Sequence, residues 1–200
     1  MTIGILALQG DVDEHLAALH RAGASATTVR TPSELHDVDA LIVPGGESTT
    51  VMKLLDRFHL AEPIVSRVHA GMPLWGTCMG MIVVARDVAP HPQPSLRLLD
   101  VTVRRNAFGR QNDSAEIPLP IPAIGPRPFP GVFIRAPWIE RVGSDVALLA
   151  QRDGHGVMVR QGNVLGTSFH PELTEDLRAH RFFLDMVHRR EDVGKQRSVA

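Results

Sequence analysis

The sequence predicts an α/β fold of three layers, a mostly parallel open sheet with helices on both faces. Two observations lead to this prediction. Short apolar runs alternate with segments of helical periodicity through the first half of the chain, which is the order of a parallel sheet with crossover helices. The chain has 200 residues, of which 44% are hydrophobic, enough for one domain with a full core.

The first half contains four predicted strands, and three of them are followed by a helix or by a turn leading to one. The acidic stretch Asp11-Val12-Asp13-Glu14 is suited to cap the first helix, which ends at Gly23. Ser48 opens a later helix after the Pro44-Gly45-Gly46 turn. We expect strands at residues 3–8, 26–30, 40–43 and 72–75, and helices at 12–22, 48–55, 62–70 and 79–86.

The sequence of the second half predicts short strands joined by tight turns. The strands are expected at residues 96–104, 132–135, 146–151, 156–160 and 163–169, with a proline-rich loop between 106 and 131. Thr174 is expected to cap a final amphipathic helix. We therefore predict one domain over residues 1–190 and a polar, disordered tail over 191–200.

Composition excludes several classes of function. The 21 basic and 22 acidic residues leave a net charge of −1, so no basic surface points to nucleic acid or membrane lipid. One cysteine rules out an internal disulfide and fits a reducing, cytoplasmic location. The apolar N-terminus lacks the basic region of a signal peptide. No histidine has the spacing of a metal-binding motif, so we expect neither a metal nor a cofactor.

The single cysteine lies at a turn that would expose it. Gly76-Thr77-Cys78-Met79-Gly80 follows an apolar strand and precedes a helix, and it is the cysteine form of the G-x-S-x-G nucleophile elbow. A sulfur at the N-terminus of a helix is favoured as the thiolate. A buried, unreactive thiol is the alternative, but the spacing and the glycines favour a nucleophile.

A nucleophile of this kind needs a base and a group that orients the base. His170 ends a predicted strand, and alternation of side chains would place Glu172 on the same side. Sites in open α/β sheets form at the carboxyl ends of the strands, where Cys78 also falls. The oxyanion of a tetrahedral intermediate would find backbone N–H donors at Gly46 and at Met79. Without the elbow, a strand end without chemistry would be the favoured interpretation of His170.

These residues resemble the class I (triad) glutamine amidotransferases, a family with a flavodoxin-like fold. The resemblance covers residues 1–190 and is closest to the glutaminase subunits of two-component pyridoxal 5′-phosphate synthases. Besides the elbow and His170-Pro171-Glu172, four strings carry it: Leu6-Ala7-Leu8-Gln9-Gly10-Asp11, Pro44-Gly45-Gly46-Glu47-Ser48-Thr49-Thr50, Arg105-Asn106-Ala107-Phe108-Gly109-Arg110-Gln111 and Phe133-Ile134-Arg135-Ala136-Pro137.

The resemblance implies hydrolysis of L-glutamine through a γ-glutamyl thioester on Cys78. The ammonia would pass to a separate (β/α)₈-barrel synthase subunit in a large hetero-oligomer, which builds pyridoxal 5′-phosphate. The positions that match the family's glutamine-binding residues are Gly46, Glu47, Ser48, Arg105, Ile134 and Arg135. An arginine suits the substrate α-carboxylate, and Glu47 suits its α-ammonium. One departure is Met79, since the family usually has alanine after the nucleophile.

The chain has no second domain that could use the ammonia, so we expect its activity to be held low until the synthase docks. The Gly45-Gly46 peptide can flip at little steric cost, and Gln9 would lie beside it and relay the contact. Two alternatives stay open. The chain could be the glutaminase of another synthase, such as that of the histidine pathway, or a non-catalytic thiol sensor of the same fold.

Overall fold

The computed structural model describes residues 1–105, 107 and 115–198, and for residues 191–198 it describes the backbone alone. The strands are β1 (Thr2–Leu6), β2 (Ser25–Val29), β3 (Ala40–Val43), β4 (Leu74–Thr77), β5 (Ala85–Ala89), β6 (Leu99–Arg104), β7 (Ala115–Leu119), β8 (Phe129–Phe133), β9 (Trp138–Val142), β10 (Ala147–Arg152), β11 (His155–Gln161) and β12 (Val164–Thr167). The helices are α1 (Val12–Arg21), α2 (Pro32–His36), α3 (Ser48–Arg57), α4 (Ala61–His69), α5 (Met79–Val84) and α6 (Arg178–Ser198), with 3₁₀ turns at Pro122–Ile124 and Pro171–Leu173.

One large sheet forms the middle layer. Its strand order is β2-β1-β3-β4-β12-β11-β9-β6-β5, and β10 pairs with β11. The first five strands of this order are parallel to one another. Beyond β12 the pairing becomes antiparallel, apart from the parallel pair β5–β6. The predicted, mostly parallel sheet is therefore confirmed for the part of the molecule that carries the nucleophile elbow.

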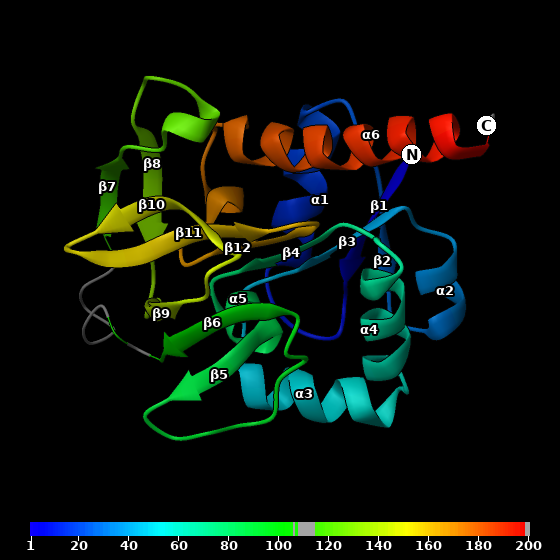
Figure 1. The fold of residues 1–200 in the computed structure, drawn as a ribbon, viewed down its shortest axis with the longest axis horizontal. Coiled ribbons are helices and arrows are strands. Elements are labelled where there is room, and N and C mark those ends of the chain that lie inside the picture. Colours follow the sequence, from blue (N-terminus) through cyan, green and yellow to red (C-terminus); the bar gives the residue numbers. More distant parts are fainter. Residues whose placement is uncertain (106, 108–114, 199–200) are drawn as a thin grey trace.

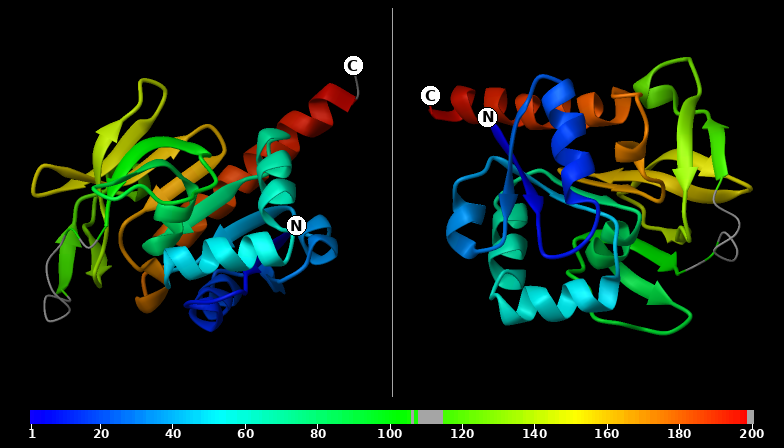
Figure 2. Two further views of the ribbon diagram at one scale, coloured as in Figure 1. Left: turned by 90° about the horizontal axis from the view of Figure 1, so that it is seen from below. Right: turned by 180° about the vertical axis from the view of Figure 1, so that it is seen from behind.

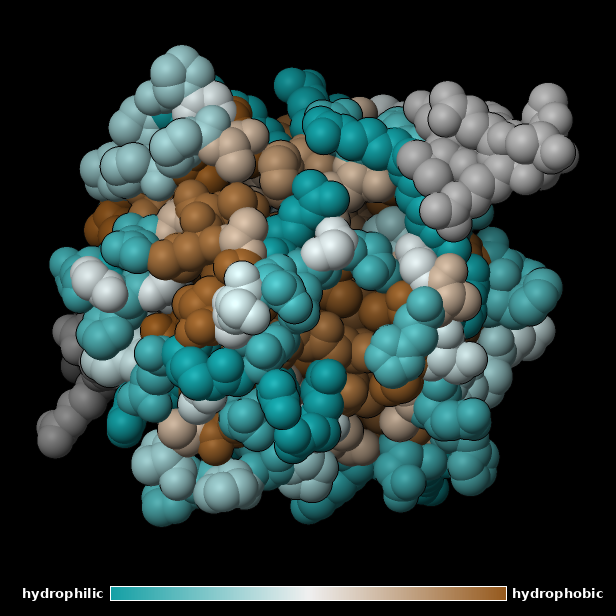
Figure 3. All heavy atoms as spheres, viewed as in Figure 1, coloured by the Kyte–Doolittle hydropathy of each residue, from teal (hydrophilic) through white to brown (hydrophobic). Residues whose placement is uncertain are grey.

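Helices cover both faces of this sheet, as the sequence predicted (Figures 1 and 2). Alternate strand residues enter two separate cores because successive side chains of a strand point to opposite faces. Ile42 and Trp75 pack with Leu19 of α1 and Phe183 of α6. Val43 and Leu74 enter the opposite core, which α2, α3, α4 and α5 cover. Figure 3 shows the surface of the molecule from the side seen in Figure 1. Hydrophilic side chains cover much of it, and apolar side chains are visible near the centre and on the upper left.

From residue 79 onward the chain departs from the predicted elements in three places. The helix expected at 79–86 ends at Val84, and the chain continues as β5 from Ala85, whose backbone is extended. β9 was not predicted, because its exposed polar residues give it no apolar strand pattern, although it pairs with β6 and β11. The expected loop at 106–131 contains β7 and most of β8, which pair as a hairpin.

The hairpin of the proline-rich segment places two of its prolines opposite each other. Pro118 lies opposite Pro130 in the register, and β7 and β8 form a two-stranded sheet of their own. A residue without an N–H is tolerated where no neighbouring strand needs that donor. Residues 106 and 108–114 of the predicted loop lie outside the described residues.

One predicted helix start is wrong, and one predicted cap residue makes no side-chain hydrogen bond. Asp11 stands at the N-cap of α1, but its side chain makes no capping hydrogen bond. Thr174 lies before α6, which begins at Arg178, and Asp176 accepts from the Arg178 N–H instead. The backbone of α6 continues to Ser198, beyond the tail boundary predicted at residue 190. Among the described residues, no helix has the length and apolar character needed to cross a membrane.

Candidate active site

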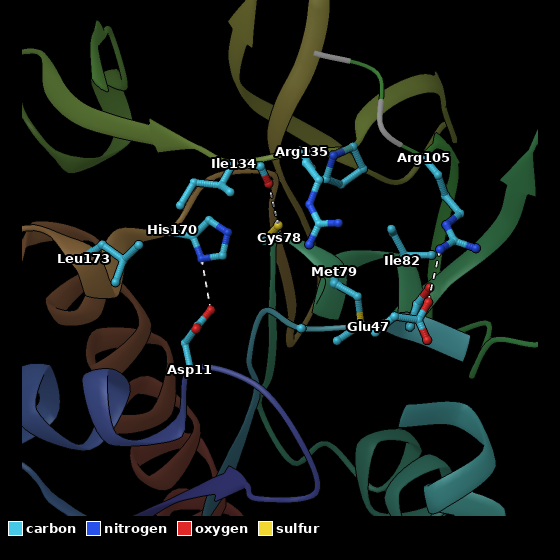
Figure 4. Close-up of a pocket in the computed structure, with 13 residues that line it drawn as sticks. Asp11, Glu47, Cys78, Met79, Ile82, Arg105, Ile134, Arg135, His170 and Leu173 are labelled. Atoms are coloured by element: carbon cyan, nitrogen blue, oxygen red, sulfur yellow. Dashed lines mark hydrogen bonds and ion pairs between the residues drawn. The ribbon is translucent and has the colours of Figure 1, made fainter. Parts of the chain in front are cut away.

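Four adjacent parallel strands bring the predicted site residues to one edge of the sheet. β1, β3, β4 and β12 are neighbours, and the segments that follow them carry Asp11, Gly46, Cys78 and His170. These residues border a pocket of about 280 Å³ (Figure 4). The pocket is lined by Asp11, Gly46, Glu47, Ser48, Cys78, Met79, Ile82, Arg105, Ile134, Arg135, Pro137, His170 and Leu173.

Cys78 has the strained backbone of a nucleophile elbow. Its φ of 47° and ψ of −110° lie where few residues with a side chain are found. The flanking glycines allow this turn because a Cβ on Gly80 would lie 1.9 Å from the Val43 carbonyl oxygen, and one on Gly76 2.5 Å from that of Gly80. The side chain is 6% exposed, and Sγ lies 3.8 Å from the Ile134 carbonyl oxygen.

His170 and Glu172 form a buried pair beside Cys78. His170 Nδ1 lies 2.7 Å from Glu172 Oε1, so Nδ1 carries the proton and Nε2 faces the cysteine (Figure 4). Burial alone would lower the pKa of His170, but hydrogen bonds to Asp11, Cys78 and Glu172 outweigh it and raise this pKa to about 12. Burial raises the pKa of Glu172, against the opposing effect of His170. This arrangement favours an imidazolium held between the Glu172 side chain and Cys78 Sγ.

Asp11 was not predicted as a site residue. Its Oδ2 lies 3.3 Å from His170 Nδ1, so the imidazole has a second carboxylate beside it. The sequence signal was ambiguous, because an aspartate before a helix is first interpreted as a cap. The same residue also contacts the glycine turn, since its N–H donates to the Gly45 carbonyl oxygen at 3.3 Å.

The Gly45–Gly46 turn packs directly against the imidazole and against the Gln9 loop. A Cβ on Gly45 would lie 2.6 Å from His170 Cε1, and one on Gly10 would lie 1.6 Å from the Gly45 oxygen. The Gln9 side chain accepts from the Glu47 N–H at 2.7 Å. Gly46 lines the pocket together with Met79, whose N–H is the first of α5 and has no partner within the helix.

Glu47 and Arg105 line the side of the pocket away from His170, whereas Ile134 lies beside His170 (Figure 4). Glu47 accepts hydrogen bonds from Thr49 and Thr50 and lies 3.2 Å from Arg105 Nη2. Burial raises the pKa of Glu47, but these hydrogen bonds lower it to about 2, so the side chain is an anion. Arg135 has a φ of 47° and projects into the pocket near Met79 (Figure 4).

Ser48 lies in the pocket wall, and its hydroxyl contacts Gln93, which the sequence did not predict as a site residue. Gln93 Nε2 donates to Ser48 Oγ at 3.0 Å, and Arg105 Nη1 donates to Gln93 Oε1 at 2.7 Å. Gln93 thereby holds both predicted binding residues in place. The string that follows Arg105 falls mostly at 106 and 108–114, outside the described residues.

Three acidic or imidazole groups in the site have ligand atoms close enough to share a metal ion. Asp11, His170 and Glu172 offer one atom each, all within 4.8 Å. The same atoms already satisfy one another as hydrogen-bond donors and acceptors around Nδ1. We interpret the cluster as an acid–base site rather than as a metal site.

The family model of the SNO glutamine amidotransferases matches residues 5–189. The chain belongs to this family. Among curated members, the pyridoxal 5′-phosphate synthase subunit PdxT of Streptomyces avermitilis is 54% identical over 187 residues, which cover 92% of this chain and 93% of that protein. The subunit of the same name from Roseiflexus castenholzii is 55% identical over 189 residues, or 93% of this chain and 100% of that one.

Solved structures agree with this family assignment. A crystal structure described as a glutamine amidotransferase superposes with a TM-score of 0.88 at 48% identity, covering 93% of this chain and 98% of the other. A structure described as a GMP synthase subunit from Thermoplasma acidophilum has a TM-score of 0.73 at 17% identity, with 98% of each chain covered, and so shares the fold. These neighbours confirm the predicted fold class of this SNO glutamine amidotransferase family member.

Proposed function

We propose that this chain hydrolyses L-glutamine to L-glutamate and ammonia, and that it is the glutaminase subunit of a pyridoxal 5′-phosphate synthase in the cytoplasm. The observation that carries the proposal is the strained Cys78 elbow with the His170–Glu172 pair beside it at the floor of one pocket. The relatives named for the synthase subunit support the choice of pathway. The location follows from the reducing conditions that a free cysteine requires.

In this mechanism, the Cys78 thiolate attacks the side-chain amide carbon of glutamine. The carbonyl oxygen becomes an oxyanion, which the N–H groups of Gly46 and Met79 stabilise. The His170 imidazolium then gives its proton to the amide nitrogen, the C–N bond breaks, and ammonia leaves. A γ-glutamyl thioester remains on Cys78, and Glu172 keeps the imidazole oriented throughout.

Water completes the reaction at the thioester. The neutral imidazole of His170 takes a proton from the water as its oxygen attacks the thioester carbon. The C–S bond breaks, glutamate leaves, and Cys78 returns as a thiolate beside the imidazolium. The substrate is held at its other end, where Glu47 suits the α-ammonium, Arg105 and Arg135 suit the α-carboxylate, and Ser48 and Ile134 shape the wall.

We further propose that a (β/α)₈-barrel synthase subunit switches this site on in a large hetero-oligomer. The Gly45 carbonyl oxygen accepts from Asp11, and the Gln9 side chain holds the Glu47 N–H. A partner that moves the Gln9 loop would therefore move the peptide that carries the oxyanion donor. Binding would shift the turn toward its active orientation.

The test compares the purified chain with and without the synthase subunit of the same organism, measuring glutamate release. We expect weak hydrolysis alone, strong stimulation by the partner, and no turnover by Cys78→Ser in either case. A diazo-ketone analogue of glutamine should modify Cys78, which is the only thiol in the chain. Hydrolysis by Cys78→Ser would overturn the proposed mechanism. Full activity of the chain without the partner would overturn the gating alone.

A synthase subunit from the histidine pathway serves as the comparison partner in that experiment. Stimulation by that subunit, and not by the pyridoxal phosphate synthase, would favour the alternative pathway. Retained thiol reactivity with no glutamate release under any condition would favour the thiol sensor.

A further inference from the structure

A buried group of histidines lies behind Glu172, outside the pocket. His15 of α1 and His180 of α6 are both 0% exposed, and His15 contacts Thr77 at the end of β4. His15 Nε2 is 3.1 Å from Thr77 Oγ1 and 3.4 Å from Glu172 Oε2, the carboxylate oxygen that does not face His170. His15 Nδ1 is 3.2 Å from His180 Nε2. A chain of polar contacts therefore runs from α6 through α1 to the acid–base site.

Both rings are neutral. Burial lowers the pKa of His180 to about 4, and burial together with His180 and His170 lowers the pKa of His15 well below its usual value. Both rings also meet Trp75 in T-shaped contacts, and Trp75 offers them no negative charge. Each ring therefore carries one proton, on one of its two nitrogens.

The surroundings decide which nitrogen carries that proton. Within the described part of the chain, no group hydrogen-bonds to the buried His180 Nδ1. A buried N–H without a partner is costly, so the His180 proton belongs on Nε2, where it points at His15 Nδ1. His15 then accepts at Nδ1 and carries its own proton on Nε2, which hydrogen-bonds to Thr77 Oγ1 and lies 3.4 Å from Glu172 Oε2. The opposite tautomer would turn a lone pair of His15 toward the Glu172 carboxylate.

We propose that His15 is a positioning residue for glutamine hydrolysis, which holds the buried Glu172 carboxylate from behind through Nε2–H while His180 fixes its tautomer. The Glu172 side chain is 0% exposed, so no water solvates its carboxylate, and its contacts with His170 and His15 take the place of that solvation. Within the described part of the chain Glu172 Oε2 makes no hydrogen bond, so His15 Nε2–H, 3.4 Å away, stabilises this oxygen by its dipole. The proposal rests on the proposed function, since it assigns a part in the same site.

A matched pair of variants separates hydrogen bonding from packing. In His15→Gln the side-chain amide can place an N–H near the position of Nε2, facing Glu172. In His15→Asn the shorter amide reaches only the position of Nδ1, facing His180. We expect kcat for glutamate release, measured with the synthase subunit present, to fall about tenfold or more in His15→Asn and to stay near wild type in His15→Gln. KM for glutamine should be unchanged, because His15 lies outside the pocket.

The pH dependence gives a readout that a merely structural role would not move. In His15→Asn the neutral form of Glu172 is favoured, so the acid limb of the kcat profile should shift upward by about one pH unit. The titratable groups that surround Glu172 are His170, Asp11 and His15, and only His15 differs between this variant and wild type. Alkylation of Cys78 by iodoacetamide, followed against pH, should show the same shift without any need for turnover.

Each outcome bears on the proposal. Wild-type kcat and acid limb in His15→Asn would overturn it, and so would equal losses in both variants with an unshifted acid limb. Should His15→Asn fail to fold, His180→Leu and His180→Gln replace the pair, since only the glutamine still donates to His15 Nδ1. A shifted acid limb in His180→Leu alone supports the proposal, and two identical profiles refute it. If wild type releases no glutamate, the proposed function fails, while the alkylation profile still decides whether His15 supports the Cys78–His170 pair.

Discussion

Acidification should destabilise the fold through His180, and the size of the effect follows from the pKa of this ring. Burial, aided by the charge of Arg21, lowers the pKa of His180 to about 4, from an ordinary value of 6.5. The unfolded chain therefore binds more protons than the native protein between these two values. Stability is fully present above pH 6.5 and is lost as the pH falls through this window.

The expected loss from His180 alone is about 2 kcal/mol at pH 5 and about 3 kcal/mol at pH 4, relative to pH 7. The measurement is the free energy of unfolding by urea at several pH values, for wild type and for His180→Gln. Glutamine can keep the hydrogen bond to His15 but does not titrate, so the difference between the two proteins isolates this ring. His36→Gln serves as the control, because the His36 side chain is 89% exposed.

The result that would refute the reasoning is a constant difference between wild type and His180→Gln from pH 7 to pH 4. That outcome would mean that His180 is protonated as readily inside the protein as in the unfolded chain. Its unpartnered nitrogen would then have a partner, and the tautomers assigned to His180 and His15 would be wrong.

Three further predictions concern the site itself. His170→Asn should leave almost no glutamate release with the synthase present. Glu172→Gln should reduce glutamate release but leave it measurable, because a tilted imidazole still accepts a proton part of the time. Equal, negligible effects of both changes on thioester formation would place the base elsewhere. Asp11→Asn removes a carboxylate whose hydrogen bond raises the pKa of His170. An NMR titration of that imidazole should therefore show a lower pKa than in wild type. An unchanged pKa would contradict the role of Asp11. Gly80→Ala would place a Cβ 1.9 Å from the Val43 carbonyl oxygen, so urea unfolding should show a loss of about 2 kcal/mol or more, and wild-type stability would contradict the close approach of α5 to β3.

Local patterns determined the elements of the parallel half and the centre of the site. The elbow around Cys78 was predictable because its glycines, its strand and its helix are adjacent in the chain, so the geometry is encoded within a few residues. His170 and Glu172 were predictable as a pair for the same reason, being two positions apart. The sequence missed β5, β7 and β9. Of these, β9 carries exposed polar residues and pairs with β6, from which β7 and β8 separate it in the chain.

Tertiary structure alone decided what surrounds these groups. Asp11 reaches His170, and His15 reaches His180 across 165 positions, because the parallel strands bring their carboxyl ends together and α1 and α6 cover the same face of the sheet. No local pattern distinguishes an aspartate that caps a helix from one that faces an imidazole, or a histidine on an apolar helix face from one that supports a catalytic carboxylate. By itself the sequence determined which atoms could react; the packing of distant elements determined which neighbours set their charge and direction.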